Sequence, residues 1–333
     1  MARRIEDAVV VITGASSGIG RATAVEFARR NARLVLAARN ESNLEKTEEL
    51  CRKAGARDVL VVPTDTTQED EVQELASQAA EEFGRMDVWI NNAGVGLYGS
   101  FEDTPIEDYR QLLETNLFGY IYGARAVLPY FRKQGTGVLI NVGSQVSLGG
   151  LPYNNAYTTS KYAVRGFSDS LRQELVDTDI EVCTVYPAST DTPFFEHAAN
   201  YSGREVQPLG SVDKPEKVAR IIVETAENPK PEVLVSPGAG TGMALLHWVA
   251  PEAYDRLLSR KTKNSHFRNK KARESQGNLY EPSDYASVHG GWSGGGGGKA
   301  AGIAAAGGAA ALLVYLLKQK RGASVRQQEE PAA

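Results

Sequence analysis

A tyrosine and a lysine stand four residues apart in the run Ala156-Tyr-Thr-Thr-Ser-Lys161. Positions i and i+4 share one face of a helix, so we expect the Lys161 ammonium beside the Tyr157 phenol. A phenol has an ordinary pKa of about 10, and a neighbouring cation lowers it by favouring the phenolate. The pair therefore suits general acid–base chemistry, although a Tyr-x3-Lys pair alone also occurs on ordinary solvated helix faces.

Two further features favour the chemical interpretation. Ser144 lies thirteen residues before Tyr157, and the glycine-rich turn Thr13-Gly-Ala-Ser-Ser-Gly-Ile-Gly20 opens the chain. Glycines let a backbone approach a pyrophosphate closely, and the helix that follows presents free N–H groups to it. The spacing is Gly-x3-Gly-x-Gly, which differs from the usual dinucleotide fingerprint. After a first strand, it favours a dinucleotide site over a structural turn.

The end of the second predicted strand indicates which dinucleotide binds. It reads Leu36-Ala-Ala-Arg39-Asn40, with no carboxylate before Glu41. An acid at this point would bind the ribose 2′-hydroxyl of NAD, whereas a cation accommodates the 2′-phosphate of NADP. Arg39 therefore favours NADP(H) over NAD(H), the alternative being an arginine that only caps a solvated loop.

The elements that must position these residues alternate along the chain. Short apolar runs rich in Val, Ile and Leu predict buried parallel strands over 8–12, 33–37, 58–62, 87–90, 137–142, 180–185 and 232–235. Amphipathic stretches between them predict helices over 18–30, 41–54, 68–83, 105–132, 157–176 and 213–227. Such alternation predicts the α/β class: one Rossmann-type, doubly wound parallel sheet of about seven strands with helices on both faces.

The chain divides by composition into five parts. Residues 1–240 form the predicted NAD(P)-binding catalytic domain, and residues 237–242, at its end, are predicted as a loop. Residues 241–273 are a partly apolar extension whose segment 256–273, with eight Lys/Arg and no acid, predicts a basic helix. Residues 274–298 end in five glycines and predict a flexible linker. An apolar, Ala/Gly-rich segment (299–321) and a polar tail (322–333) complete the chain.

Bulk composition excludes several classes of protein. A formal charge of −4 argues against nucleic-acid binding. Cys51 and Cys183 lack metal spacing and fit reduced core residues, and four scattered histidines make a metal site improbable. The N-terminus lacks the apolar region of a secretion signal, so we expect a cytoplasmic or cytoplasm-facing, membrane-associated protein.

Together these motifs resemble the short-chain dehydrogenase/reductase family, of the Tyr-x3-Lys type with a TGxxxGxG cofactor motif. The match covers residues 8 to about 235 and includes Asn91-Asn-Ala-Gly94 and Asn116. The resemblance implies an adenine contact for Asp65, a nicotinamide-side turn at Pro187 and a carboxamide contact for Thr192. Ala188 replaces the glycine usual after that proline. The implied cofactor set is Gly14, Ser16, Ser17, Gly18, Ile19, Gly20, Arg39, Asp65, Asn91, Ala93, Gly94, Tyr157, Lys161, Pro187 and Thr192.

The resemblance also implies a reaction, the interconversion of a carbonyl and an alcohol. Tyr157 would be the general acid, Lys161 would lower its pKa and bind the nicotinamide ribose, and Ser144 would hold the substrate oxygen. Asn116 would anchor a relay water. Ser144 as a strand-end turn residue and Asn116 as a helix-interior polar group are the alternatives. A catalytically silent scaffold is the alternative for the whole chain, and the family implies a homo-oligomer.

Two segments bear on substrate and location. The loop from Pro187 to Leu209 has the composition of a lid, and six of its own and nearby side chains predict an apolar pocket or, equally, ordinary packing: Leu148, Leu151, Tyr153, Phe194, Phe195 and Tyr201. Residues 300–317 carry no charge and would be about 27 Å long as a helix, barely a bilayer core. We expect membrane attachment there, assisted by the basic segment 256–273, with a soluble alanine-rich tail as the alternative.

Overall fold

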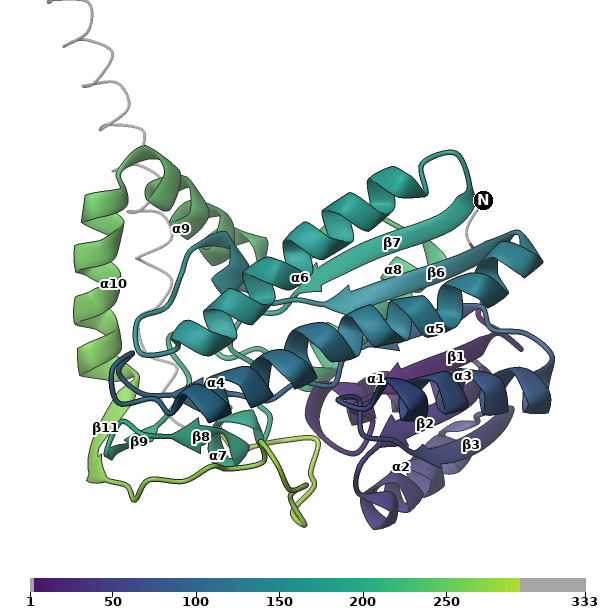
Figure 1. Ribbon diagram of the computed structural model, residues 1–333, viewed down its shortest axis with the longest axis horizontal. Coiled ribbons are helices and arrows are strands. Elements are labelled where there is room, and N and C mark those ends of the chain that lie inside the picture. The colour runs from purple at the N-terminus through teal and green to yellow at the C-terminus, as the bar shows by residue number, and fades with distance from the viewer. Residues whose placement is uncertain (1–2, 294–333) are drawn as a thin grey trace, which may run out of the picture.

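The computed structural model describes residues 3–293, which build around one parallel sheet (Figure 1). Its strand order is β10-β7-β6-β4-β1-β2-β3, so the chain starts in the middle and winds outward in both directions. The strands are β1 (Val9–Thr13), β2 (Arg33–Ala38), β3 (Asp58–Pro63), β4 (Val88–Asn91), β6 (Thr136–Val142), β7 (Asp179–Tyr186) and β10 (Glu232–Leu234). The predicted doubly wound α/β fold is confirmed.

Helices cover both faces of the sheet. One face carries α1 (Gly18–Ala28), α2 (Glu41–Ala54) and α8 (Pro215–Glu227), and the other carries α3 (Glu69–Phe83), α5 (Gly119–Gln134) and α6 (Asn155–Glu174). Alternate side chains of β1 enter the two cores, Val10 with Phe27 on one side and Val11 with Trp89 on the other. Burial on both faces explains why the strands read as continuous apolar runs. Cys51 and Cys183 are buried and unpaired, as expected.

The predicted helix over 105–132 is interrupted. It consists of α4 (Ile106–Leu113), one π-helical turn η1 (Glu114–Phe118) and α5. The wide turn carries Asn116, which is fully buried and bonds the backbone of Val95 in both directions. Single π turns inside α-helices are frequent at functional sites, and this one directs Asn116 toward the carboxyl edge of the sheet.

The predicted lid after Pro187 is tied down by two small sheets. It contains the short helix α7 (Phe194–His197) and the strands β8 (Ala199–Asn200) and β9 (Arg204–Val206). β8 pairs with β5 (Leu97–Tyr98), and β9 pairs with β11 (Phe267–Lys271) from the C-terminal extension. The extension is therefore joined to the substrate side of the domain.

Three predictions for residues 237–293 are wrong. Residues 237–242 belong to a helix, α9 (Pro237–Val249), since Pro237 at its first turn starts it despite the glycines that follow. The segment 256–273, predicted as one basic helix, is helical only as far as Ser265, where α10 (Pro251–Ser265) ends. The strand β11 follows it. Residues 274–293 do not form a free linker: they return along the catalytic domain from β11 toward α2, as the yellow-green trace of Figure 1 shows.

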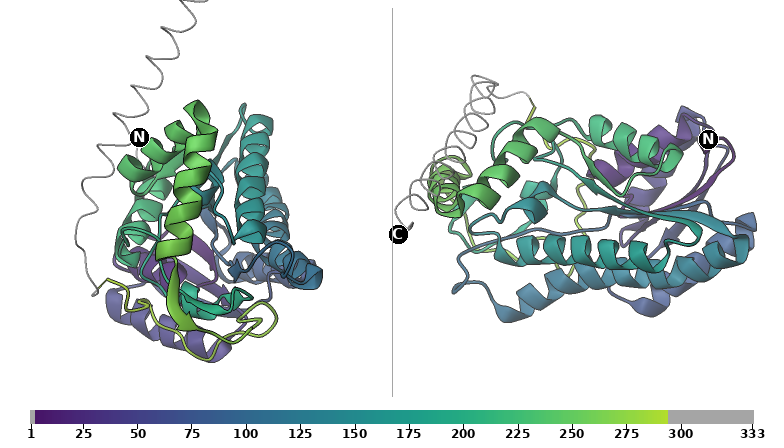
Figure 2. Two further views of the ribbon diagram at one scale, coloured as in Figure 1. Left: turned by 90° about the vertical axis from the view of Figure 1, so that its left-hand side faces the viewer. Right: turned by 90° about the horizontal axis from the view of Figure 1, so that it is seen from above.

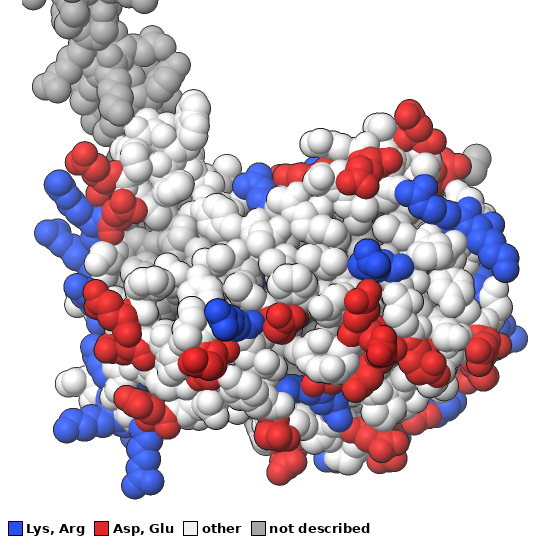
Figure 3. All heavy atoms as spheres, in the orientation of Figure 1, with Lys and Arg blue, Asp and Glu red and all other residues white. Residues whose placement is uncertain are grey.

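Figure 2 shows α9 and α10 side by side at the end of the molecule toward which the strand arrows point. Lys and Arg side chains gather along the edge formed by α10 and β11 (Figure 3). Within residues 3–293, no helix combines the length and the apolar character needed to cross a bilayer. The segment predicted for the membrane, 299–321, lies outside the described residues.

Candidate active site

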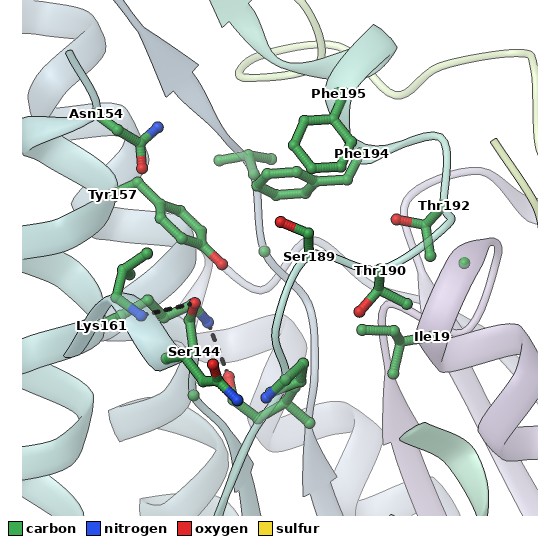
Figure 4. Close-up of a pocket in the computed structure, with 18 of the residues that line it drawn as sticks. Ile19, Ser144, Asn154, Tyr157, Lys161, Ser189, Thr190, Thr192, Phe194 and Phe195 are labelled. Atoms are coloured by element: carbon green, nitrogen blue, oxygen red, sulfur yellow. Dashed lines mark hydrogen bonds between the residues drawn. The ribbon is translucent and has the colours of Figure 1, made fainter. Parts of the chain in front are cut away.

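A cavity of about 750 Å³ opens at the carboxyl edge of the sheet. Parallel α/β sheets bind ligands at this edge, where the loops between strands and helices diverge. All the predicted cofactor and catalytic residues line it except Asn91 and Asn116. Figure 4 shows the glycine-turn residue Ile19 on one side and Tyr157 with Lys161 on the other.

Tyr157 lies in the first turn of α6, and its phenol points toward Ser144 (Figure 4). Ser144 follows β6 and caps the short 3-10 helix η2 (Gln145–Leu148), its hydroxyl accepting from the Val146 amide at 3.3 Å. Burial raises the pKa of Tyr157 to about 12, opposed by its hydrogen bond with Ser144. The phenol is therefore held protonated.

Lys161 is 3% exposed on the same face of α6. Its Nζ donates to the Val142 carbonyl at 2.8 Å and to the Tyr120 hydroxyl at 3.2 Å. Burial lowers the pKa of Lys161 to about 7. The expected lowering of the Tyr157 pKa by Lys161 is not observed here, because burial dominates both groups.

Two buried asparagines, Asn116 and Asn91, do not line the cavity but form hydrogen bonds close to it. The Asn116 amide accepts from the Val95 N–H at 2.8 Å and donates to the Val95 carbonyl at 2.9 Å. The Asn91 amide is used within the sheet, where it donates to Asn141 at 2.9 Å and accepts from the Trp89 indole at 2.8 Å. Asn91 therefore does not face the cavity as a cofactor contact, and it stabilises the strand ends.

The turn between β1 and α1 leaves little room for a side chain at its glycines. Gly14 has φ +67°, and a Cβ on Gly20 would lie 2.2 Å from the Gly14 carbonyl oxygen. The Thr13 hydroxyl accepts from the amides of Asn92 and Ala93 at 3.0 and 3.1 Å, which fixes the neighbouring loop against the turn. This narrow turn, with no Cβ at Gly14, Gly18 or Gly20, lies at a helix N-terminus and fits a pyrophosphate.

Arg39 follows β2, and no carboxylate in the described part of the chain neutralises its charge directly. No ion pair within 4.0 Å involves it among residues 3–293, and its guanidinium donates to the carbonyls of Asn278 and Tyr280, both at 2.7 Å. Burial lowers its pKa, opposed by the nearby charges of Asp65 and Glu281. A cation at this position fits the additional phosphate of NADP.

The substrate side of the cavity is apolar. Of the six predicted side chains, Leu148, Leu151, Phe194 and Phe195 line it. The other two do not: Tyr153 packs edge-on against Phe267, and Tyr201 belongs to the core beside Leu97. The rings of Tyr157 and Phe194 lie 5.4 Å apart, so the apolar wall reaches the phenol.

Sequence reasoning missed two groups of lining residues. The extension contributes Met243, Leu246, Tyr254, Leu257, Leu258, Lys261 and His266, and residues 274–293 contribute Asn278, Pro282, Ser283, Tyr285 and Ala286. The apolar patch in 243–250 was a signal for the first group, because such a patch outside a complete domain needs a surface to cover.

Comparison with known proteins places this chain among oxidoreductases. Residues 8–201 match the model of the short chain dehydrogenase family. An uncharacterized oxidoreductase of Bacillus subtilis, YxnA, is 37% identical over 263 residues, covering 78% of this chain and 73% of that protein. The 3-ketodihydrosphingosine reductase of Bos taurus is 35% identical over 224 residues, covering 65% of this chain and 68% of that protein.

Solved structures show the same architecture. An alcohol dehydrogenase from the archaeon Thermococcus sibiricus, complexed with 5-hydroxy-NADP, has a TM-score of 0.61 at 29% identity and covers 68% of this chain and 95% of its own. Fold and site define an NAD(P)-dependent oxidoreductase that acts on CH–OH and C=O groups. The chain belongs to the short-chain dehydrogenase/reductase family.

Proposed function

We propose that this protein is an NADP(H)-dependent oxidoreductase that interconverts an apolar ketone and its alcohol, with Tyr157 as general acid and base. The observation that carries the proposal is the Tyr157 phenol, which points toward Ser144 at the wall of the cavity with the buried Lys161 on the same helix face (Figure 4). A scaffold protein is disfavoured, because it would not need a buried lysine and tyrosine beside an open cavity.

The proposed chemistry of reduction assigns one task to each side chain. The bound nicotinamide supplies the hydride. Tyr157 gives its proton to the carbonyl oxygen, and Ser144 donates a hydrogen bond to the same oxygen as negative charge develops there. The charged form of Lys161, 5.8 Å from the centre of the Tyr157 ring, stabilises the phenolate left behind. In oxidation the same proton returns to Tyr157.

The preference for NADP(H) rests on Arg39. Its guanidinium lies at the cavity wall without a carboxylate partner in the described chain, and a phosphate would neutralise its charge. The pyrophosphate would be held by the glycine turn, namely Gly14, Ser16, Ser17, Gly18, Ile19 and Gly20. The rest of the cofactor would contact Asp65, Ala93, Gly94, Pro187 and Thr192. The NADP analogue bound by the archaeal relative supports this preference.

The substrate side supports a ketone rather than a charged or sugar-like compound. Leucine, methionine and phenylalanine side chains contribute to that wall, among them Leu148, Met243 and Phe194. The bovine relative is named as a reductase of a keto compound, which agrees with reduction as the direction.

Purified full-length protein tests the proposal directly. We expect NADPH to be oxidised in the presence of aliphatic ketones, faster than NADH under the same conditions, with rates that rise as the chain lengthens. Cofactor binding without turnover on any ketone, aldehyde or alcohol would favour the scaffold interpretation instead.

Membrane attachment by the C-terminal segment stays a proposal. It rests on the uncharged run 300–317 and on the basic edge of α10 and β11. Fractionation of the full-length protein against a version that ends at Gly298 tests it. Equal recovery of both without detergent would contradict the attachment.

A further inference from the structure

Residues 276–293, called the strap below, cross the cofactor side of the cavity. Their carbonyl oxygens accept from donors of the Rossmann motifs. The Arg39 guanidinium donates to Asn278 at 2.7 Å, Leu279 at 3.3 Å and Tyr280 at 2.7 Å. The Asn43 amide of α2 donates to Ser283 at 3.2 Å. Backbone oxygens of the strap thus engage Arg39, the proposed reader of the 2′-phosphate, and Asn43 of α2.

The same pattern continues at the glycine turn. The N–H of Gly18, which begins α1, donates to the Ser287 carbonyl at 2.9 Å, and the buried Arg21 donates to the Ala286 carbonyl at 3.2 Å. Helix N-terminal amides lack acceptors within the helix, which is why they bind phosphates. Here a carbonyl oxygen, which carries a partial negative charge, takes the place of a phosphate oxygen.

Both ends of the strap are also anchored by contacts other than those with these donors. Near its start, Leu279 is completely buried, and the Tyr280 hydroxyl donates to the buried Asp108 at 2.9 Å. Near its end, Asp191 accepts from the Trp292 amide at 2.7 Å and from the hydroxyl of Ser293. Charge-assisted hydrogen bonds of this kind are among the stronger ones, so the strap is a docked element.

We propose that the strap is a gate on the cofactor site, in which its carbonyl oxygens hold Arg39 and Gly18 until the phosphates of NADP(H) replace them. The proposal rests on the proposed cofactor. The Gly18 N–H and the Arg39 N–H groups that the carbonyls engage are not free for phosphate, so the strap must leave before these groups can bind it. Association of the cofactor is then limited by how often the strap opens.

The rate of NADPH association to full-length protein, followed by stopped-flow fluorescence, tests the gate. Leu279→Ala removes a buried anchor, and we expect it to raise the association rate constant at least about tenfold. Its control is Leu50→Ala on α2, a leucine that is 41% exposed and should leave the rate unchanged. An unchanged rate in Leu279→Ala would overturn the gate.

A milder pair of variants guards against misfolding of Leu279→Ala. Tyr280→Phe removes the bond to Asp108, and Tyr162→Phe makes the same change at a tyrosine of equal exposure, 40%, on α6. We expect a faster association of about two- to tenfold in the first and none in the second. Equal rates in the two variants would count against the gate.

Hydrogen exchange separates a gate from a lid that closes over bound cofactor. If NADPH releases the strap, the amides of Asn278 and Trp292 lose their acceptors and exchange faster when cofactor is bound. Slower exchange with NADPH would show a lid and overturn the proposal. Failure of NADPH to bind the native protein or any variant would instead overturn the proposed function, and the gate with it.

A second observation concerns the substrate side. His266, 1% exposed and outside the family match, lines the cavity between Tyr98 and Phe267. Its Nδ1 is hydrogen-bonded with the Gln207 carbonyl, so Nδ1 carries the proton of the neutral ring. Its Nε2 is then an acceptor, and it is buried without a partner among the described residues. A buried acceptor without a donor is costly unless a ligand supplies one.

The geometry points to His266 as a specificity residue that accepts a hydrogen bond from a hydroxyl on the ketone substrate. This rests on the proposed function and deepens it. The probes are an aliphatic ketone and hydroxyketones of the same length, with the hydroxyl at successive carbons. We expect native protein to favour one hydroxyketone over the parent ketone by at least about tenfold in kcat/KM.

His266→Phe keeps a ring of similar shape and removes the acceptor. We expect the substitution to abolish the preference. Both substrates are assayed with the same preparation, so partial unfolding lowers both rates equally and leaves the ratio of their kcat/KM values unchanged. An unchanged ratio in His266→Phe, or no preference in the native protein, would overturn this assignment. If neither ketone is turned over by native protein, the proposed function fails first.

Discussion

The Lys161 ammonium lies 5.8 Å from the centre of the Tyr157 ring, but its hydrogen bonds go to Val142 and Tyr120. The helix spacing therefore brings the two side chains together without bonding them directly. Burial lowers the pKa of Lys161 to about 7, so both its charged and its neutral forms are populated near neutral pH. The electrostatic support that Tyr157 receives varies with pH in this range.

This burial predicts a pH-dependent stability. The folded state binds the Lys161 proton less tightly than the unfolded state, whose lysine has a pKa of 10.5. The contribution of Lys161 to the free energy of unfolding is thus complete above pH 10.5 and decreases as the pH falls toward 7. We expect the melting temperature of the native protein to rise from pH 7 to 9.5 relative to that of Lys161→Met. A constant difference would contradict the lowered pKa.

The close packing of the glycine turn predicts that a larger residue at position 20 destabilises the protein. Gly20→Ala places a Cβ against the backbone of Gly14, so the turn must shift. We expect a loss of at least about 1 kcal/mol in the free energy of unfolding and weaker cofactor binding by titration. Gly166→Ala on α6 is the control, since nothing lies within 4 Å of its Cβ. A helix gains about 0.5–1 kcal/mol from such a change. Equal effects of the two substitutions would refute the steric argument.

Cofactor choice gives a third prediction. Arg39→Asp replaces the cation at the cavity wall by an anion, which repels a phosphate. We expect the Kd for NADPH to rise at least about tenfold and the Kd for NADH to change much less. Fluorescence titration of both cofactors measures this. Equal weakening of the two would mean that Arg39 does not read the 2′-phosphate.

Local patterns sufficed to predict the sheet and the main catalytic side chains. Each buried strand is a short apolar run, and the i, i+4 spacing alone places Tyr157 and Lys161 on one helix face. The π turn at Asn116 was not predictable in this way. It depends on bonds to Val95, a residue that is distant in sequence and brought near only by the fold.

The strap was missed for the same reason. Its composition resembles a linker, because its docking uses main-chain carbonyls that accept from Arg39 and Gly18. Such contacts leave no side-chain pattern in the sequence. The start of α9 at Pro237 was missed because the glycines that follow the proline favour a loop when the segment is considered by itself.

Proton donation by Tyr157 is tested most directly by steady-state turnover of a ketone with NADPH in native protein and in Tyr157→Phe. The substitution keeps the ring that packs on Phe194 and removes only the hydroxyl near Ser144. We expect kcat to fall by about 10²–10⁴, while the Kd for NADPH stays within about twofold. Full activity in Tyr157→Phe would contradict the assignment of Tyr157 as the proton donor.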